Sequence, residues 1–133
     1  MRNALLIFLG SGLGGVARWA LGDWLTARLG PGFPWATLAV NVSGSFAIGL
    51  IAAVTGPGGR WMAPPVWRLF FMVGVCGGYT TFSSFSLQTL NLLEEGAWGR
   101  AGANVGMSVL LCLAGVGLGH WVGTLWNTAG VEG

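Results

Sequence analysis

Charged residues are scarce in this chain. Only 8% of its 133 residues are charged, whereas soluble domains have about 25%. The cations are six arginines with no lysine, and no basic run suggests a nucleic-acid partner. Hydrophobic residues make up 53% of the chain. The composition therefore excludes an ordinary soluble domain and predicts an integral membrane protein.

Other absences exclude whole classes of chemistry. Cys76 and Cys112 lie in apolar segments without CxxC or Cys/His spacing, so neither a disulfide framework nor a zinc site is indicated. No nucleophile and base pair or phosphate-binding loop is recognisable, and the chain is not expected to be an enzyme. No acidic residue lies near the middle of an apolar segment. His120 is the only protonatable alternative there, and we interpret it as a packed or interfacial histidine.

Four apolar segments are long enough to cross a bilayer: 3–24, 35–55, 66–93 and 101–126. Turns rich in Gly and Pro at 30–34 and 56–65, and Glu94-Glu95-Gly96, separate them. The connections are short, so neighbouring helices should be antiparallel and both termini should lie on one side. We expect one all-α membrane domain over residues 1–133, with close helix packing at GxxxG spacings, namely Gly10/Gly14, Gly102/Gly106 and Gly115/Gly119/Gly123.

The loop arginines give almost no orientation signal. Cytoplasmic loops normally carry the positive excess. Here the terminal side would hold three arginines and the other side two, with Arg18 near the end of its span; the loop residues are Arg2, Arg60 and Arg68 against Arg28 and Arg100. Insertion in both directions would allow an antiparallel homodimer. A weakly biased protein with a single orientation is the alternative.

The third apolar segment contains VGVCGGYTTFSSFS, residues 73–86. Gly77 and Gly78 favour the end of a first half-helix, and Thr80 or Thr81 can cap a second one. A break at the bilayer midplane would leave carbonyls that suit a cation facing amides that suit an anion. The alternative is a packed kink whose hydroxyls bond to the preceding turn.

Aromatic and polar residues follow this break. Phe82 and Phe85 share a helical face, and the electropositive edges of their rings could line the path of a small anion. Asn41 offers an amide donor in the second span, and Arg18 should face the protein or a vestibule, or reach the interface. Further hydroxyls and amides lie nearby; Ser43 and Ser45 are expected to serve as interhelical partners, the others being Thr81, Ser84, Gln88, Asn104 and Ser108.

Three stretches carry a family resemblance: GSGLGGVARW (10–19), TLAVNVSGSFAIG (37–49) and GVCGGYTTFSSFS (74–86). Together they closely resemble the Fluc (CrcB-like) fluoride channels over nearly the whole chain. The resemblance implies a dual-topology antiparallel homodimer in the lipid bilayer of the inner (plasma) membrane. Two antiparallel pores would carry fluoride passively out of the cell, around a central structural Na⁺.

The resemblance also implies roles for single residues. The backbone carbonyls of Gly77 and Thr80 would bind Na⁺, and Arg18 would be the vestibule arginine. The pore residues would be Asn41, Phe82 and Phe85, with hydroxyls from Thr81, Ser84 and Ser108.

The chain departs from the family pattern at a few positions. Ser11, Gly15 and Ala36 stand where the family usually has Gly, Ala and Gly, and Ser84 stands where Thr is common. Asn104 stands where the family tends to have a Tyr, so the resemblance does not extend to the outer part of the line of pore hydroxyls. Two other functions stay open: a small proton-coupled multidrug exporter, which would need a membrane carboxylate, and a non-conducting structural subunit of a larger complex.

Overall fold

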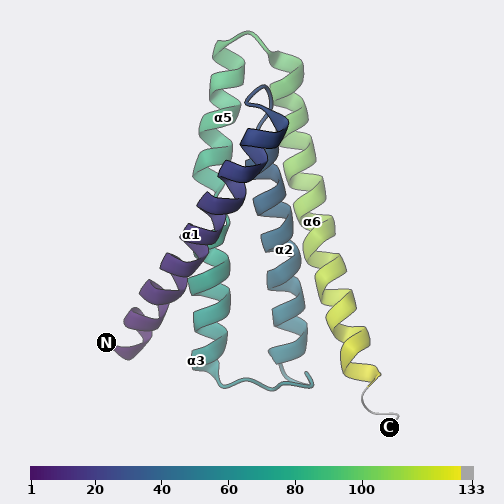
Figure 1. Cartoon of the computed structure of the whole chain (residues 1–133). Coiled ribbons are helices and arrows are strands. Elements are labelled where there is room, and N and C mark those ends of the chain that lie inside the picture. Colours follow the sequence, from purple (N-terminus) through teal and green to yellow (C-terminus); the bar gives the residue numbers. More distant parts are fainter. Residues whose placement is uncertain (130–133) are drawn as a thin grey trace.

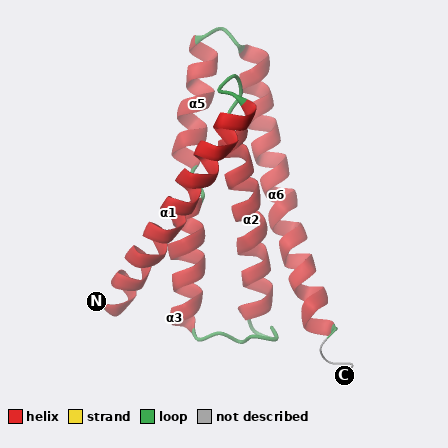
Figure 2. Cartoon of the chain, in the orientation of Figure 1, coloured by secondary structure: helices red, strands yellow, loops and turns green. Residues whose placement is uncertain are grey.

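The computed structural model describes residues 1–129, and these form helices joined by short loops (Figures 1 and 2). Three long helices are α1 (Arg2–Leu29), α2 (Trp35–Thr55) and α6 (Trp98–Thr128). The segment expected as the third span is divided among α3 (Pro65–Arg68), the π-helical η1 (Leu69–Cys76), α4 (Gly77–Tyr79) and α5 (Phe82–Glu94). The all-α prediction is confirmed. The second span has its predicted bounds, and the first and fourth are several residues longer than expected.

Three helices, α1, α2 and α6, are long and apolar enough to cross a membrane by length and composition. The elements of the third segment are each too short to meet that criterion alone. The start of α1 and the end of α6 lie at the same end of the molecule as α3 (Figure 1). The start of the first span and the end of the fourth therefore lie on one side, as predicted.

Helix α1 leans across the third segment and packs on it through glycines (Figure 1). A Cβ atom on Gly10 would lie 2.8 Å from the carbonyl oxygen of Phe70 and 2.9 Å from Gly74 Cα. A Cβ on Gly14 would lie 2.7 Å from the backbone nitrogen of Tyr79. Such distances leave no room for any other side chain. The close approach predicted at Gly10 and Gly14 is confirmed.

Helices α2 and α6 form the second close pair. A Cβ on Gly119 would lie 3.0 Å from Leu50 N, and one on Gly49 would lie 3.0 Å from His120 N, so each helix needs its own glycines at the contact. Within the described residues a Cβ on Gly102 or Gly106 would meet nothing within 4 Å. The close approach expected at that pair is therefore not made between helices of this chain.

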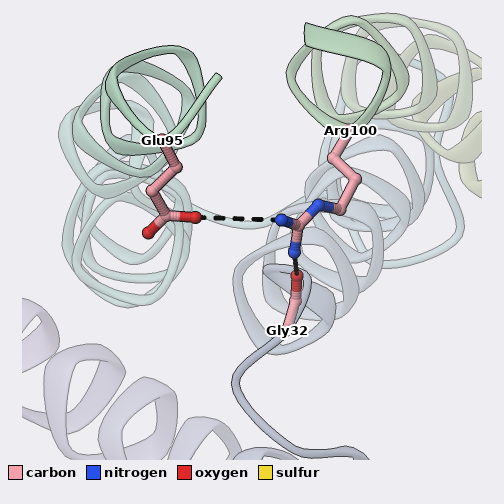
Figure 3. Close-up of polar contacts among 3 residues, drawn as sticks. All are labelled: Gly32, Glu95 and Arg100. Carbon is pink, nitrogen blue, oxygen red and sulfur yellow. Dashed lines mark hydrogen bonds and ion pairs between the residues drawn. The ribbon is translucent and has the colours of Figure 1, made fainter. Parts of the chain in front are cut away.

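Polar bonds tie the loops at both ends of the bundle. Arg100 donates to the carbonyl oxygen of Gly32 at 2.7 Å, and its guanidinium lies 3.9 Å from the Glu95 carboxylate (Figure 3). At the other end Asn127 donates to the Ala53 carbonyl at 3.0 Å and accepts from the Arg60 amide at 3.0 Å. These bonds join segments that are distant in sequence and hold the ends of α2 and α6 in register.

Candidate ion-binding site

The third segment leaves helical geometry at two residues. Thr80 (φ −80°, ψ 157°) and Thr81 (φ −150°, ψ 110°) are extended between α4 and α5. The Thr81 hydroxyl accepts the Ser84 N–H at 3.2 Å, so Thr81 is the N-cap of α5, as predicted. We refer to Thr80 and Thr81 as the interruption.

The two glycines before the interruption do not end the helix, contrary to the prediction. Gly77 keeps helical angles (φ −65°, ψ −38°), and α4 continues to Tyr79. Gly78 serves packing, because a Cβ there would lie 2.6 Å from Ser11 Cα. The glycine pair lies within three residues of the interruption, so the sequence placed the break in the correct region. From sequence alone, however, a glycine needed for packing against α1 cannot be distinguished from a glycine that ends a helix.

Asn41 of α2 bonds to both sides of the Thr81 backbone. Its side-chain oxygen accepts the Thr81 N–H at 2.7 Å, and its side-chain amide donates to the Thr81 carbonyl at 3.0 Å. The side chain was predicted as a donor toward an anion. One of its two amide hydrogens is used by Thr81, which leaves the other for a ligand.

Carbonyl oxygens are left free on the α4 side of the interruption. Both the amide and the hydroxyl of Thr80 donate to the Cys76 carbonyl at 3.0 Å. Across residues 1–129, by contrast, no hydrogen bond reaches the carbonyl oxygens of Gly77 or Thr80. A carbonyl within the hydrocarbon region of a bilayer needs a partner, and uncharged oxygens of this kind bind hard cations. The two residues predicted as carbonyl ligands therefore have the free acceptors that a cation requires.

Amides are left free on the α5 side. The first N–H groups of a helix have no intrahelical acceptor. The Thr81 hydroxyl satisfies only the Ser84 amide, and within the described chain no acceptor is found for the amides of Phe82 and Ser83. Together with the positive end of the α5 dipole, these donors favour an anion.

A cavity of about 460 Å³ lies beside the interruption. It collects most of the predicted site residues; those that line it are Asn41, Gly77, Thr80, Thr81, Phe82, Phe85 and Ser108. The Phe82 and Phe85 ring centroids are 5.1 Å apart, as expected for residues on one helical face. The cavity thus combines two aromatic rings with hydroxyl and amide side chains.

A smaller cavity of about 120 Å³ holds the remaining two predicted residues, Arg18 and Ser84. Thr81 lines both cavities, and Thr37 and Gln88 are the other polar side chains that line the smaller one. Within the described chain the Arg18 Nε atom and the Gln88 Oε1 atom are buried without a hydrogen-bond partner. A buried guanidinium donor without an acceptor creates a local demand for an anion or water.

Sequence reasoning missed some polar pairs around these cavities. Tyr79 and Ser43 share a hydrogen bond of 2.9 Å between their hydroxyls, which confirms the interhelical role predicted for Ser43. Asn104 is 1% exposed and donates to the Thr89 hydroxyl at 2.9 Å. A polar residue in an apolar segment signals that a partner exists but not which one. Thr37 offered a weak signal, four residues before Asn41 on the same helical face.

The helices and cavities define a class of protein. The chain is an α-helical, multi-pass membrane protein whose third apolar segment is interrupted at Thr80 and Thr81, beside a cavity. Discontinuous membrane helices of this kind characteristically bind ions at their opposed ends.

Comparison with known proteins gives the family. The family model described as CrcB-like protein, Camphor Resistance (CrcB), matches residues 5–120. The fluoride-specific ion channel FluC of Rhodospirillum rubrum is 54% identical over 127 residues, which cover 96% of this chain and 98% of the relative. The protein of the same name from Opitutus terrae is 57% identical over 116 residues, 87% of this chain and 88% of the relative. This chain belongs to the CrcB-like family.

Proposed function

We propose that this protein is a fluoride-specific ion channel of the plasma membrane that lets fluoride leave the cell down its electrochemical gradient. The relatives that share more than half of its residues are named for that activity. The cavity beside the interruption supports the proposal most strongly, because Asn41, Phe82, Phe85 and Ser108 meet there from three different helices. This set provides the donors and ring edges that replace the hydration of a small anion.

The hydroxyl line beside the cavity gives the anion a route. Thr81 lies between the two cavities, and its hydroxyl donates to Ser84 at 3.0 Å. Arg18 in the smaller cavity would raise the local concentration of anions at the entrance. Fluoride would pass from the Arg18 vestibule along Ser84 and Thr81 to the phenylalanine pair.

We propose further that two copies assemble antiparallel, with one pore along each subunit. The near balance of loop arginines supports dual topology. Phe82 and Leu113 line the larger cavity and are 78% and 65% exposed, so a second subunit would cover them. Fusing the chain separately to a reporter active only in the cytoplasm and to one active only outside tests this. Activity of both supports dual topology, and activity of one alone contradicts it.

The free carbonyls of Gly77 and Thr80 would hold a structural Na⁺ at the centre of this dimer. Each subunit would contribute both oxygens, and the cation would neutralise the negative carbonyl end of α4. This role needs no acidic ligand, which agrees with the lack of carboxylates near the interruption among residues 1–129. The interruption would then lie at the bilayer midplane, where the two antiparallel subunits cross.

Fluoride efflux from proteoliposomes tests the function. The purified protein is reconstituted, and external fluoride is followed with an electrode while chloride efflux is measured in parallel. Fast fluoride release that requires a potassium ionophore, without chloride release, is the expected result. Release that follows a pH gradient would indicate a proton-coupled exporter instead. No release from folded protein would leave the structural subunit as the better explanation.

A further inference from the structure

We propose that Asn41 is a positioning residue for the cation site: it holds the Thr81 amide away from Gly77 and so keeps the Gly77 carbonyl free. This inference rests on the cation binding proposed above. It assigns to Asn41 a second task, distinct from its role as a donor in the fluoride pore.

The hydrogen-bond pattern before the interruption carries the argument. In an α-helix each N–H bonds to the carbonyl four residues earlier. Thr80 follows this rule, because its amide donates to Cys76 at 3.0 Å. The next amide, that of Thr81, would bond to Gly77, but it donates to the Asn41 oxygen at 2.7 Å instead. The helical ladder therefore stops at the carbonyl that is needed for the cation.

The second bond of Asn41 makes this capture specific. Its amide group donates to the Thr81 carbonyl at 3.0 Å, so the N–H and the C=O of one residue are both held by one side chain. Such paired bonds fix the extended geometry of Thr81, with φ −150° and ψ 110°. The bond that accepts the Thr81 N–H is the one that keeps this amide from Gly77, and the bond to the Thr81 carbonyl adds to the hold on the extended geometry.

Neighbouring residues support the same geometry without replacing Asn41. The Thr80 hydroxyl donates to Cys76, and Gly44 of α2 leaves room for the Thr80 methyl group. In the described part of the chain, Asn41 provides the only side-chain bonds to the Thr81 backbone. Loss of Asn41 would release the Thr81 amide, and its nearest helical acceptor is the Gly77 oxygen.

The two tasks of Asn41 are chemically separable. Its oxygen accepts the Thr81 amide, whereas its NH₂ group keeps one hydrogen that Thr81 does not use, and this is the donor that the proposed function assigns to fluoride. Asn41→Asp keeps an acceptor for Thr81 but replaces the donor with a carboxylate. Asn41→Ser removes both bonds, because a helical serine bonds to its own preceding turn.

The experiment measures Na⁺ binding separately from fluoride flux. The thermal unfolding midpoint of the purified dimer is followed as Na⁺ replaces N-methylglucamine at constant ionic strength, and fluoride efflux is recorded for each variant. The wild type should be stabilised by Na⁺. In Asn41→Ser the Na⁺ concentration for half-maximal stabilisation should rise at least tenfold. Asn41→Asp should keep the Na⁺ response of the wild type but lose fluoride efflux.

Asn104→Ser is the matched control, because it also truncates a hydrogen-bonded amide but lies away from the interruption. It should lower the midpoint without changing the Na⁺ concentration needed. If Asn41→Ser does not fold, Asn41→Gln takes its place, since the extra methylene displaces the amide from Thr81. A wild-type Na⁺ response in Asn41→Ser or Asn41→Gln would overturn the inference, and so would loss of that response in folded Asn41→Asp.

Two measurements on the wild-type protein distinguish failure of this inference from failure of the proposed function. Fluoride efflux without any Na⁺ stabilisation would overturn the inference and leave the channel standing. Na⁺ stabilisation without fluoride efflux would leave the cation site standing and overturn the channel function.

Discussion

The rings of Phe82 and Phe85 lie 5.1 Å apart in the first turn of α5, yet Phe82 is 78% exposed and Phe85 only 8%. One ring is therefore held by its own chain, while the other stands on an open face. In an antiparallel dimer the open ring would contact the second subunit. The pair thus joins the inside of one subunit to the surface where the other would pack.

Replacing either ring should reduce fluoride efflux. Phe82→Ile removes an electropositive ring edge while keeping an apolar surface, and we expect a loss of at least about tenfold, which corresponds to roughly 1.4 kcal/mol on the barrier. The dimer should remain intact on size-exclusion chromatography because the exposed surface stays apolar. Phe85→Ile should reduce efflux similarly and also lower the thermal midpoint, since it opens space in a buried site. Unchanged efflux in both variants would remove the rings from the pore.

Arg18 should affect entry more than passage. Arg18 lines the smaller cavity, and its Nε atom has no hydrogen-bond partner among residues 1–129, so Arg18→Gln removes a charge that attracts anions. We expect efflux to fall several-fold at low ionic strength and the difference from wild type to shrink in high salt, where charge attraction is screened. Arg18→Lys should retain most of the effect. An Arg18→Gln defect that does not depend on salt would contradict a steering role.

Gly14 should tolerate no side chain. A Cβ there would lie 2.7 Å from Tyr79 N and 3.0 Å from the Gly78 carbonyl carbon, both backbone atoms that cannot move aside. Overpacking costs about 1–3 kcal/mol, so Gly14→Ala should lower the thermal midpoint and the yield of folded protein. Gly15→Ala in the same helix is the control, because nothing lies within 4 Å of its Cβ. Equal behaviour of the two variants would show that α1 does not pack as described.

Asn104 and Thr89 should be energetically coupled. Asn104 donates to the Thr89 hydroxyl, which itself donates to the Phe85 carbonyl at 2.8 Å. Thr89→Val leaves the buried Asn104 amide without its partner, whereas the double variant with Asn104→Leu removes both polar groups. A double-mutant cycle on stability should give a coupling of about 0.5–1.5 kcal/mol. Additive effects would mean that this bond contributes nothing.

Arg100 should contribute more to thermal stability than its acidic partner Glu95. Its bond to the Gly32 carbonyl is 2.7 Å, but its contact with Glu95 is 3.9 Å and both side chains are more than half exposed. Exposed ion pairs contribute about 0–1 kcal/mol, so Glu95→Gln should leave the thermal midpoint unchanged. Arg100→Gln should lower it by a few degrees, because the loop at Gly32 loses its donor. If Glu95→Gln lowered the thermal midpoint as much as Arg100→Gln, the ion pair and not the bond to Gly32 would be the stabilising contact.

Much of the architecture could be predicted from the sequence, because apolar length and glycine turns directly limit what a chain can do in a bilayer. The second span, 35–55, has its predicted bounds, and Gly10 and Gly14 pack as their spacing indicated. Gly102 and Gly106 have the same spacing, but no helix of the described residues lies against them. Spacing shows that a close approach is sterically allowed, but it contains no information on which helix lies opposite.

In the candidate site, too, local features could be predicted from the sequence, whereas contacts between distant residues could not. Composition and periodicity were enough to indicate a membrane protein, a capped break near Thr81 and an aromatic pair after it, since each depends on residues near one another in sequence. The bond from Asn41 to Thr81 spans 40 positions, and that from Asn104 to Thr89 spans 15. Such pairs exist only once the helices have packed, because the partner of a buried polar group is chosen by geometry in space. The folded arrangement therefore determined which side chain holds the Thr81 amide away from the Gly77 carbonyl.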